Sequence, residues 1–241
     1  MTGGRKRRRR LIVNADDFGQ SEGVTGGILA AHEHGIVTST SLMVRWPAAA
    51  DAVSRARAFG SLSVGLHIDL GEWRRCDDQW DVVYQVVDSD DADAVRREVV
   101  GQFERFEALC GRPPSHVDSH QHVHTRGPAL PVAREMARRF GIVLRQYSDI
   151  VTYSGAFYGQ TSEGQPLSDL IRVPALIKTL EDLPDGTTEL SCHPAMRADL
   201  VTTYSAERIV ELATLCDPEV RAAVERCGIQ LISFDDVGSS A

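Results

Sequence analysis

Short runs of apolar and β-branched residues alternate with helix-like segments along almost the whole chain. The strand-like runs cover residues 11–19, 36–44, 62–70, 116–124, 142–145, 187–194 and 229–234. The segments expected to be helical cover residues 21–34, 48–59, 91–109, 128–140, 167–180, 206–215 and 218–227. A strand followed by a helix, repeated about seven times, is typical of a parallel α/β fold.

Several of the predicted strands end in residues that can bind a metal or move a proton. The first ends in Asp16 and Asp17, the third carries His67 near its end, and another ends in His193. The carboxyl ends of parallel strands form the chemical face of α/β folds, and contributions from so many strands favour a barrel over an open sheet. An aspartate-rich turn that caps the next helix is the alternative for the first strand.

The first strand poses a geometric problem, because adjacent residues of a straight strand face opposite ways. Asp16 and Asp17 are adjacent, and Phe18 and Gly19 follow them. For both carboxylates to reach one site, we expect the chain to curl at Phe18 and Gly19.

The densest polar segment is His116-Val-Asp-Ser-His-Gln-His-Val-His124. In an extended strand its four histidines and Asp118, all at even positions, would lie on one face. Such a concentration of imidazoles and a carboxylate predicts a metal site. Because not all of them can be ligands, a structural or supporting role stays open for His116 and His124.

Charge and composition restrict the partners. The chain of 241 residues has a formal net charge of −8, and six of its 26 basic residues lie in the first ten positions. The remaining acidic body would repel nucleic acid. We expect residues 1–10 to be a disordered basic tail, with a nucleic-acid or membrane-surface arm as the alternative. Residues 11–241 are expected to form a single catalytic domain.

Further patterns bear on cofactors and location. Neither a Gly-x-Gly-x-x-Gly fingerprint nor a phosphate-binding Gly-Lys-Ser/Thr loop occurs, so nucleotide binding has no support. No stretch approaches the length of a membrane span. Five scattered cysteines without a Cys-x-x-Cys pair indicate a reducing cytoplasm.

An aspartate with two histidines is a ligand set that suits a divalent ion and leaves positions open for water and substrate. A neighbouring carboxylate can act as a general base, and a further histidine can act as a general acid. Together these residue types predict metal-assisted hydrolysis.

Five motifs, taken in order, resemble those of the YdjC-like (ChbG-type) carbohydrate deacetylase family. They are Asn14-Ala-Asp-Asp-Phe-Gly19, Gly35-Ile-Val-Thr-Ser-Thr40, Gly65-Leu-His67, the segment from His116 to His124, and Cys192-His-Pro194. The resemblance extends from about Leu11 to Phe234. It implies a distorted (β/α) barrel related to polysaccharide deacetylases. It also implies one divalent ion, Zn²⁺ or Mg²⁺, and removal of acetyl from an N-acetylated amino sugar or a short chitooligosaccharide-like oligosaccharide, with a metal-bound water as nucleophile.

The resemblance also implies roles for single residues. It makes Asp17, His67 and His120 the metal ligands. It makes Asp16 the general base and His193 the general acid. Independently of the resemblance, a fourth metal ligand is the other role open to His193.

The expected substrate contacts are less specific. The candidates to line a sugar site are Arg145, at a strand exit, and four aromatic residues in segments 71–90 and 147–167. These aromatic residues are Trp73, Trp80, Phe157 and Tyr158. Both segments are expected to be loops, and such loops over α/β cores often face substrate. Aromatic faces suit the apolar face of a pyranose, and simple loop packing is the alternative.

Two rival functions stay open at this point. One is another metal-dependent hydrolase such as a phosphoesterase, and the other is a non-catalytic sugar-binding relative. In each case a small molecule or oligosaccharide is the expected partner, without nucleic acid or membrane, and a homodimer is left open.

Overall fold

The computed structural model describes residues 9–76, 79–161, 163–200, 202 and 204–237. Eight parallel strands form one curled sheet. Seven follow the order β7-β6-β3-β2-β1-β9-β8, and β10 pairs with the beginning of β1. The strands are β1 (Arg9–Phe18), β2 (Ser39–Leu42), β3 (Ser63–Ile68), β6 (His116–Ser119), β7 (Val143–Leu144), β8 (Thr152–Ser154), β9 (Gly186–Cys192) and β10 (Gln230–Leu231). The predicted parallel α/β barrel with about seven strands is therefore confirmed as a half-barrel.

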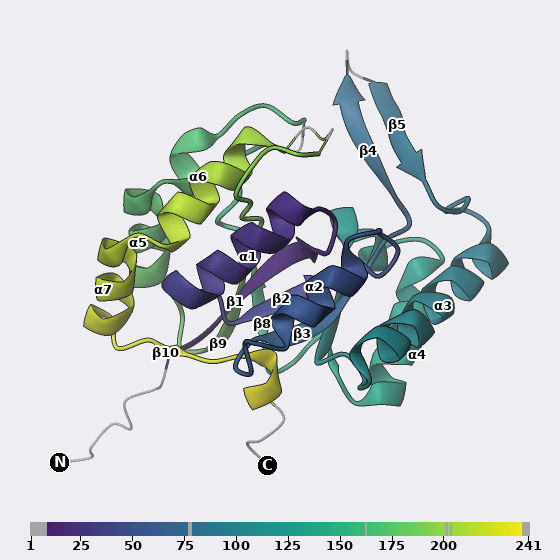
Figure 1. The fold of residues 1–241 in the computed structure, drawn as a ribbon, viewed down its shortest axis with the longest axis horizontal. Coiled ribbons are helices and arrows are strands. Elements are labelled where there is room, and N and C mark those ends of the chain that lie inside the picture. Colours follow the sequence, from purple (N-terminus) through teal and green to yellow (C-terminus); the bar gives the residue numbers. More distant parts are fainter. Residues whose placement is uncertain (1–8, 77–78, 162, 201, 203, 238–241) are drawn as a thin grey trace.

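Seven α-helices of the described chain surround the sheet (Figure 1). They are α1 (Glu22–His34), α2 (Ala49–Ala56), α3 (Ala92–Cys110), α4 (Ala129–Phe140), α5 (Val173–Glu181), α6 (Ala206–Leu215) and α7 (Pro218–Arg226). In Figure 1, α1 and α2 lie over β1, β2 and β3, while α5, α6 and α7 stand on one side and α3 and α4 on the other. None of the helices in the described residues is long and apolar enough to cross a bilayer.

Local signals in the sequence set many of the boundaries. The Ser21 side chain accepts a hydrogen bond from the Val24 N–H and caps α1, which ends before Gly35 as predicted. Both α3 and α4 end at a glycine in the left-handed conformation, Gly111 with φ 69° and Gly141 with φ 65°. These contacts involve neighbours in the chain, so the sequence alone predicts them.

The sheet buries its central strand except for the first two residues, Arg9 and Arg10, which are partly buried. From Leu11 to Phe18, every residue of β1 is buried, because β2 and β9 pair with it on either side. Apolar side chains on the helix-facing side of the sheet form the main core, in which the Phe103 ring stacks on Phe140 at 5.3 Å. This rigid layer fixes the positions of the strand ends.

Some predicted boundaries shift. Strand β1 begins at Arg9, because Arg9 and Arg10 pair with β9, so the predicted tail is two residues too long. The rest of that tail, residues 1–8, lies outside the described residues. For segment 167–180 the sequence leaves two alternatives, Pro174 early in one helix or Pro174 splitting it. The structure has a 3-10 turn (η2, Ser168–Ile171) followed by α5, with Pro174 in the first turn of α5.

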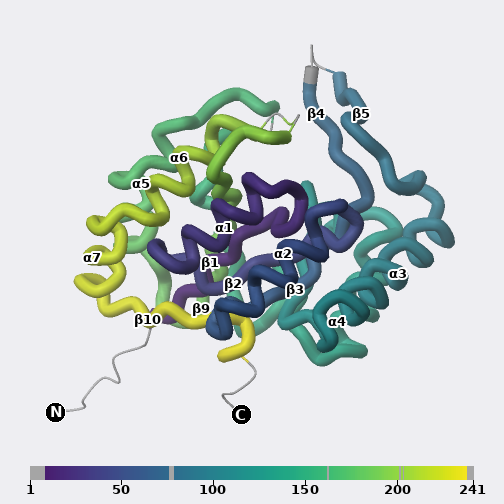
Figure 2. Tube along the Cα trace, in the orientation of Figure 1, coloured from purple at the N-terminus to yellow at the C-terminus, as the bar shows by residue number. Residues whose placement is uncertain are grey.

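The two segments expected to be loops contain strands. Segment 147–167 contributes β8 to the sheet. Segment 71–90 forms an antiparallel hairpin of β4 (Gly71–Cys76) and β5 (Gln79–Gln85), here called the arm, which projects from the body (Figures 1 and 2). Its aromatic and β-branched residues favour pairing as strands. At its base the Tyr84 hydroxyl donates to Asp69 Oδ1 at 3.0 Å.

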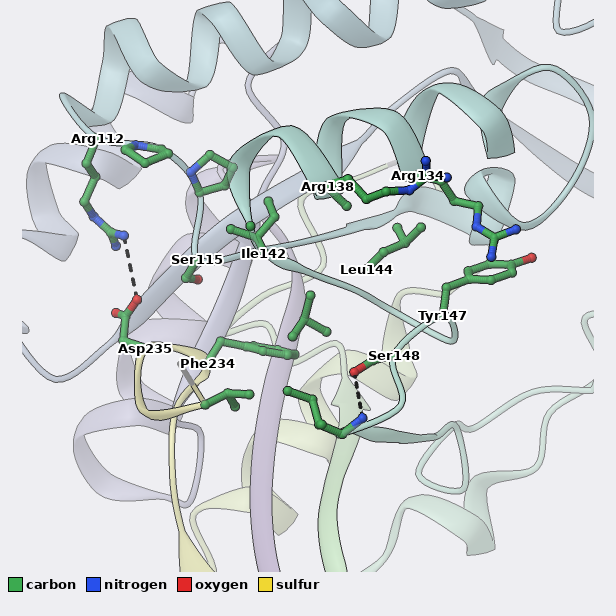
Figure 3. A pocket seen from close by; sticks show the side chains of 17 residues that line it. Arg112, Ser115, Arg134, Arg138, Ile142, Leu144, Tyr147, Ser148, Phe234 and Asp235 are labelled. Atoms are coloured by element: carbon green, nitrogen blue, oxygen red, sulfur yellow. Dashed lines mark hydrogen bonds and ion pairs between the residues drawn. The ribbon is translucent and has the colours of Figure 1, made fainter. Parts of the chain in front are cut away.

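A cavity of about 680 Å³ lies where β6 and β7 begin (Figure 3). Ile142, Leu144 and Phe234 line it, and the Arg134 guanidinium lies 5.2 Å from the centre of the Tyr147 ring. None of the residues predicted for the active site lines this cavity. Those residues lie toward the carboxyl ends of the strands.

Two helical glycines give a matched test of this packing. A Cβ added at Gly27 of α1 would lie 2.4 Å from the Ala195 Cα, whereas one added at Gly101 of α3 would meet nothing within 4 Å. We expect Gly101→Ala to raise the free energy of unfolding by about 1 kcal/mol through helix propensity, and Gly27→Ala to lower it by about 1–3 kcal/mol through overpacking. Urea denaturation of both variants measures this, and equal shifts of the same sign would contradict the packing.

Candidate active site

The end of β1 turns both of its aspartates toward the site. Asp17 has a left-handed backbone with φ 69°, and the pairing of β1 with β2 shifts register between Ala15 and Phe18. Such an irregularity re-aims a side chain, and aspartate adopts this conformation more readily than most residues. The curl expected at Phe18 and Gly19 therefore begins one residue earlier, at Asp17 itself.

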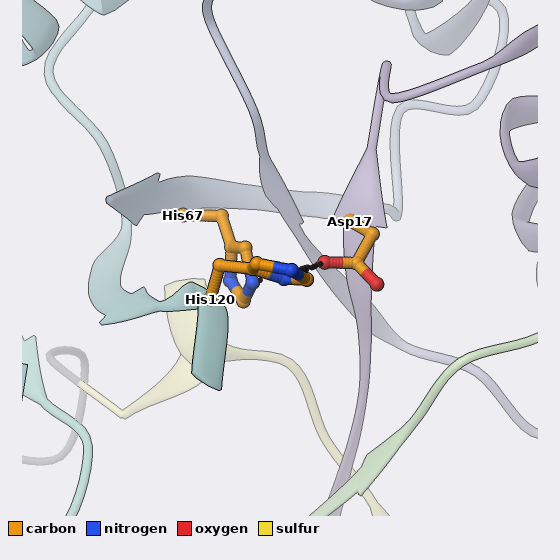
Figure 4. A group of neighbouring side chains, drawn as sticks. All are labelled: Asp17, His67 and His120. Atoms are coloured by element: carbon orange, nitrogen blue, oxygen red, sulfur yellow. Dashed lines mark hydrogen bonds and ion pairs between the residues drawn. The ribbon is translucent and has the colours of Figure 1, made fainter. Parts of the chain in front are cut away.

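Three predicted ligand residues converge at the strand ends (Figure 4). Asp17 Oδ1 lies 2.9 Å from His120 Nδ1 and 3.1 Å from His67 Nε2. One potential donor atom from each residue lies within 4.8 Å of the others. One carboxylate oxygen and two imidazole nitrogens, buried together, suit a divalent ion with positions left for water and substrate. The donor set therefore fits the expected ion.

Charged partners hold the atoms of this cluster that face away from it. Asp118 Oδ1 lies 2.7 Å from His67 Nδ1, and Arg208 Nη2 donates to Asp17 Oδ2 at 2.6 Å. A carboxylate on the outer nitrogen of a histidine fixes its tautomer and leaves the inner nitrogen to bind a cation. The arrangement is thus already oriented before any ion is bound.

Electrostatics raise the pKa of both histidines. Burial opposes protonation, but Asp118 raises the pKa of His67 to about 10, and Asp17 raises that of His120 to about 9. Despite its own burial, Asp17 has a pKa held well below its usual value, mainly by Arg208 and His120. Without a cation both rings would carry a proton at neutral pH, and a binding ion would displace it.

Arg145 fixes the other aspartate from inside the barrel. Its guanidinium donates to both oxygens of Asp16, at 2.6 and 2.7 Å, and lies 2.7 Å from Asp118 and from Glu189. It also lies 5.1 Å from the centre of the Tyr153 ring. The side chain is completely buried, so the predicted substrate contact by Arg145 is wrong. A side chain that follows a strand can lie inside the barrel instead of facing solvent, as the side chain of Arg145 does.

His193 faces Asp16 from the end of β9. Its Nε2 lies 3.7 Å from Asp16 Oδ2, and 17% of its side chain is exposed. Its backbone N–H donates to Glu211, and its ring packs edge-on against Tyr158 and Tyr204. The preceding Cys192 is fully buried, as expected for adjacent strand residues that face apart.

The candidate residues open into one cavity of about 1040 Å³. Its lining includes all five of the predicted catalytic and ligand residues together with three of the predicted aromatic contacts: Asp16, Asp17, His67, His120, His193, Trp73, Trp80 and Tyr158. Phe157 is fully buried in the hydrophobic core instead, so its predicted contact with substrate is wrong. Its neighbour Tyr158 takes the wall position.

The histidine-rich segment does not form one strand. Strand β6 stops at Ser119, and the 3-10 turn η1 (His120–Thr125) contains two left-handed residues, Gln121 with φ 48° and His122 with φ 54°. This break ends the two-residue alternation, so the prediction of one histidine face is wrong. His116 stacks on Phe234 with ring centres 3.7 Å apart, and burial lowers its pKa to about 3.

Some supporting residues were not found from the sequence. Arg208 and Glu211 lie three positions apart on α6, which places them on one helix face, and both are buried. Glu72 on β4 lies 3.5 Å from His120 Nε2. The opposite charges of Arg208 and Glu211 on the core side of one helix were a signal that the sequence offered for this pair. The local sequence offered no such signal for Glu72.

Glu189 gives this charge cluster a measurable pH dependence. Burial raises its pKa to about 7, against the opposing effect of Arg145. An unfolded glutamate has a pKa of about 4.3, so folding takes up a proton between these values and stability falls as pH rises through them. We expect metal-free wild type to lose roughly 3 kcal/mol relative to Glu189→Gln between about pH 4 and pH 8. Parallel urea titrations test this, and identical pH profiles would contradict it.

Comparisons with known proteins agree with the geometry. A family model described as YdjC-like protein matches residues 10–226. A carbohydrate deacetylase from Geobacillus stearothermophilus is 34% identical, over 94% of this chain and 97% of that protein. A chitooligosaccharide deacetylase from Serratia marcescens is 31% identical, over 94% of this chain and 98% of that protein.

Solved structures show the same fold. A protein from Enterococcus faecalis V583, given as a cellobiose-phosphate cleavage protein, has a TM-score of 0.76 and 26% identity over 95% of this chain and 99% of that chain. A family 4 carbohydrate esterase from Streptomyces lividans has a TM-score of 0.55 at 12% identity, over 92% and 91% of the two chains, and is similar in fold. With its motifs, its half-barrel and a family match over most of its length, the chain belongs to the YdjC-like family.

Proposed function

We propose that this protein is a divalent-metal-dependent carbohydrate deacetylase that hydrolyses the N-acetyl group of an amino sugar or short oligosaccharide. The proposal rests on one observation: the candidate metal ligands, the candidate base and the candidate acid all line the same cavity. Asp17 faces the two candidate ligand histidines, while the adjacent Asp16 lies 3.7 Å from His193. A pure sugar-binding protein needs no such base beside a cation site.

Asp16 is suited to act as the general base. Burial raises the pKa of Asp16, but the Arg145 guanidinium outweighs this effect and holds the pKa below its usual value. The carboxylate is therefore ionised near neutral pH. Both of its oxygens are fixed by Arg145, which holds the carboxylate in one orientation. Asp16 takes the proton from the water that attacks the acetyl carbonyl.

The expected ion would be held by Asp17, His67 and His120. When bound, it would supply Lewis-acid activation of water and of the acetyl carbonyl. His193 gives a proton to the nitrogen that leaves, because an amine departs poorly without one. The products are acetate and the free amino sugar.

The geometry favours one ion over the two of many phosphoesterases. Asp16, His67 and Asp118 also lie close enough together to form a second donor group. Arg145 already pairs with both of these carboxylates, so its guanidinium already compensates their negative charge. A second metal would have to displace a buried guanidinium.

The walls of the cavity support a sugar as substrate. Trp73 and Trp80 come from the arm, and Tyr158 comes from the segment after β8. Aromatic faces pack on the apolar face of a pyranose, and the acidic body of the chain suits an uncharged ligand. Relatives named as carbohydrate and chitooligosaccharide deacetylases agree with this substrate class.

Two neighbouring aspartates should have separable roles. We expect Asp16→Asn to retain a bound divalent ion, because Asp17, His67 and His120 are unchanged, and to lose roughly two to four powers of ten in rate, because the base is lost. Asp17→Asn should lose most metal affinity. Acetate release from a panel of N-acetylated sugars, with metal titration of each variant, measures both effects. An Asp16→Asn variant with a near-normal rate would refute the role of the base.

His193 should be separable from the ligands by its substrate dependence. We expect His193→Gln to bind the ion normally and to deacetylate about 100-fold more slowly, because the amine is no longer protonated. The loss should be smaller for an acetyl ester with a good leaving group. Comparing kcat for the two substrates measures this. Loss of metal from the variant would instead make His193 a ligand.

A further inference from the structure

The arm contributes a buried carboxylate to the candidate metal site. Glu72, at the root of β4, is only 4% exposed, although the far part of the arm carries Trp80 with 60% exposure. Its Oε2 lies at ion-pair distance, 3.5 Å, from His120 Nε2, a buried nitrogen without a hydrogen bond, and its Oε1 accepts a hydrogen bond from the Thr202 hydroxyl at 2.8 Å. The arm therefore contacts the ligand cluster through one specific side chain.

Burial makes this contact more than a surface ion pair. A buried carboxylate is costly unless a charge or hydrogen-bond donor compensates it. Among the described residues, His120 is the one basic side chain within ion-pair distance of Glu72. His120 Nδ1 meanwhile faces Asp17 at 2.9 Å. The two nitrogens of this ring are thus divided between the ligand cluster and the arm.

A second contact ties the same two segments together. Gln121, the residue after His120, has a left-handed backbone with φ 48°. Its side-chain oxygen accepts from the Trp73 N–H at 3.0 Å, and its amide donates to the Trp73 carbonyl at 2.7 Å. A strained backbone of this kind persists where its surroundings hold it. Consecutive residues of the arm therefore hold consecutive residues of η1.

We propose that Glu72 is a positioning residue of the metal site, and that through it the arm and the ion are thermodynamically coupled. The inference rests on the proposed metal site at Asp17, His67 and His120. A carboxylate facing the outer nitrogen of His120 favours the tautomer with its proton on Nε2, which leaves Nδ1 to the ion and makes Nδ1 more basic. Coupling is reciprocal, so an ion that tightens this contact also stabilises the root of the arm.

Calorimetric titration of metal-stripped protein with Zn²⁺ tests whether Glu72 positions the metal site. We expect Glu72→Gln to weaken binding roughly 10- to 100-fold, because the outer carboxylate is lost without a change of shape. The matched control is Asp81→Asn, which removes a charge from the exposed part of the arm, where Asp81 lies 3.9 Å from Arg74. The control should bind Zn²⁺ as the wild type does.

Hydrogen exchange of the arm tests whether the arm and the ion are coupled. Adding Zn²⁺ should slow exchange of amides at the root of β4 in the wild type and in Asp81→Asn, and should leave them unchanged in Glu72→Gln. Wild-type affinity and protection in Glu72→Gln would overturn this inference alone. Failure of the wild type itself to bind Zn²⁺ or another divalent ion would overturn the proposed function as well, which keeps the two outcomes distinct.

Discussion

The guanidinium of Arg145 is the cation around which the interior of the half-barrel is arranged. Three carboxylates approach it from three strands: Asp16 from β1, Asp118 from β6 and Glu189 from β9. Buried charges of one sign cannot stay together without compensation, and removing one member of such a group costs several kcal/mol. Arginine suits this position because its fixed fork binds both oxygens of one carboxylate and still reaches others.

That interaction separates two aspartates that are adjacent in sequence. Arg145 holds Asp16 on one side, and Arg208 from α6 holds the outer oxygen of Asp17 on the other. The left-handed residue at the end of β1 directs the two carboxylates to different partners. One of them is thereby kept ionised beside His193, and the other faces the histidines. The same pair of residues can serve two roles because its surroundings differ.

Support for the site comes from segments far apart in the chain. Asp118 belongs to β6, Glu72 to the arm, and Arg208 and Glu211 to the helix after the last site strand. Each of these residues contacts a residue of the site at atoms that face away from the cavity. Such orientation before substrate binds is what a hydrolytic site requires, since reorganisation during the reaction is costly.

The sequence by itself determined the alternation of strands and helices, several helix ends, and the residues at the strand ends. These depend on periodicity and capping, which act between residues close in the chain. Asp16, Asp17, His67 and His193 were found in this way at predicted strand ends, whereas the family motifs singled out His120 and suggested the roles of all five. The roles themselves stay proposals, whereas the convergence of the five side chains on one cavity is observed.

Only the tertiary structure decided which charges are paired and which side chains reach the cavity. Arg208 and Asp17 are 191 positions apart, and Arg145 and Asp16 are 129 apart, so no local pattern links them. Phe157 and Tyr158 are adjacent, yet one is in the core and the other on the cavity wall. Burial is set by how the sheet curls and which helix returns over it, and that packing is a property of the whole chain.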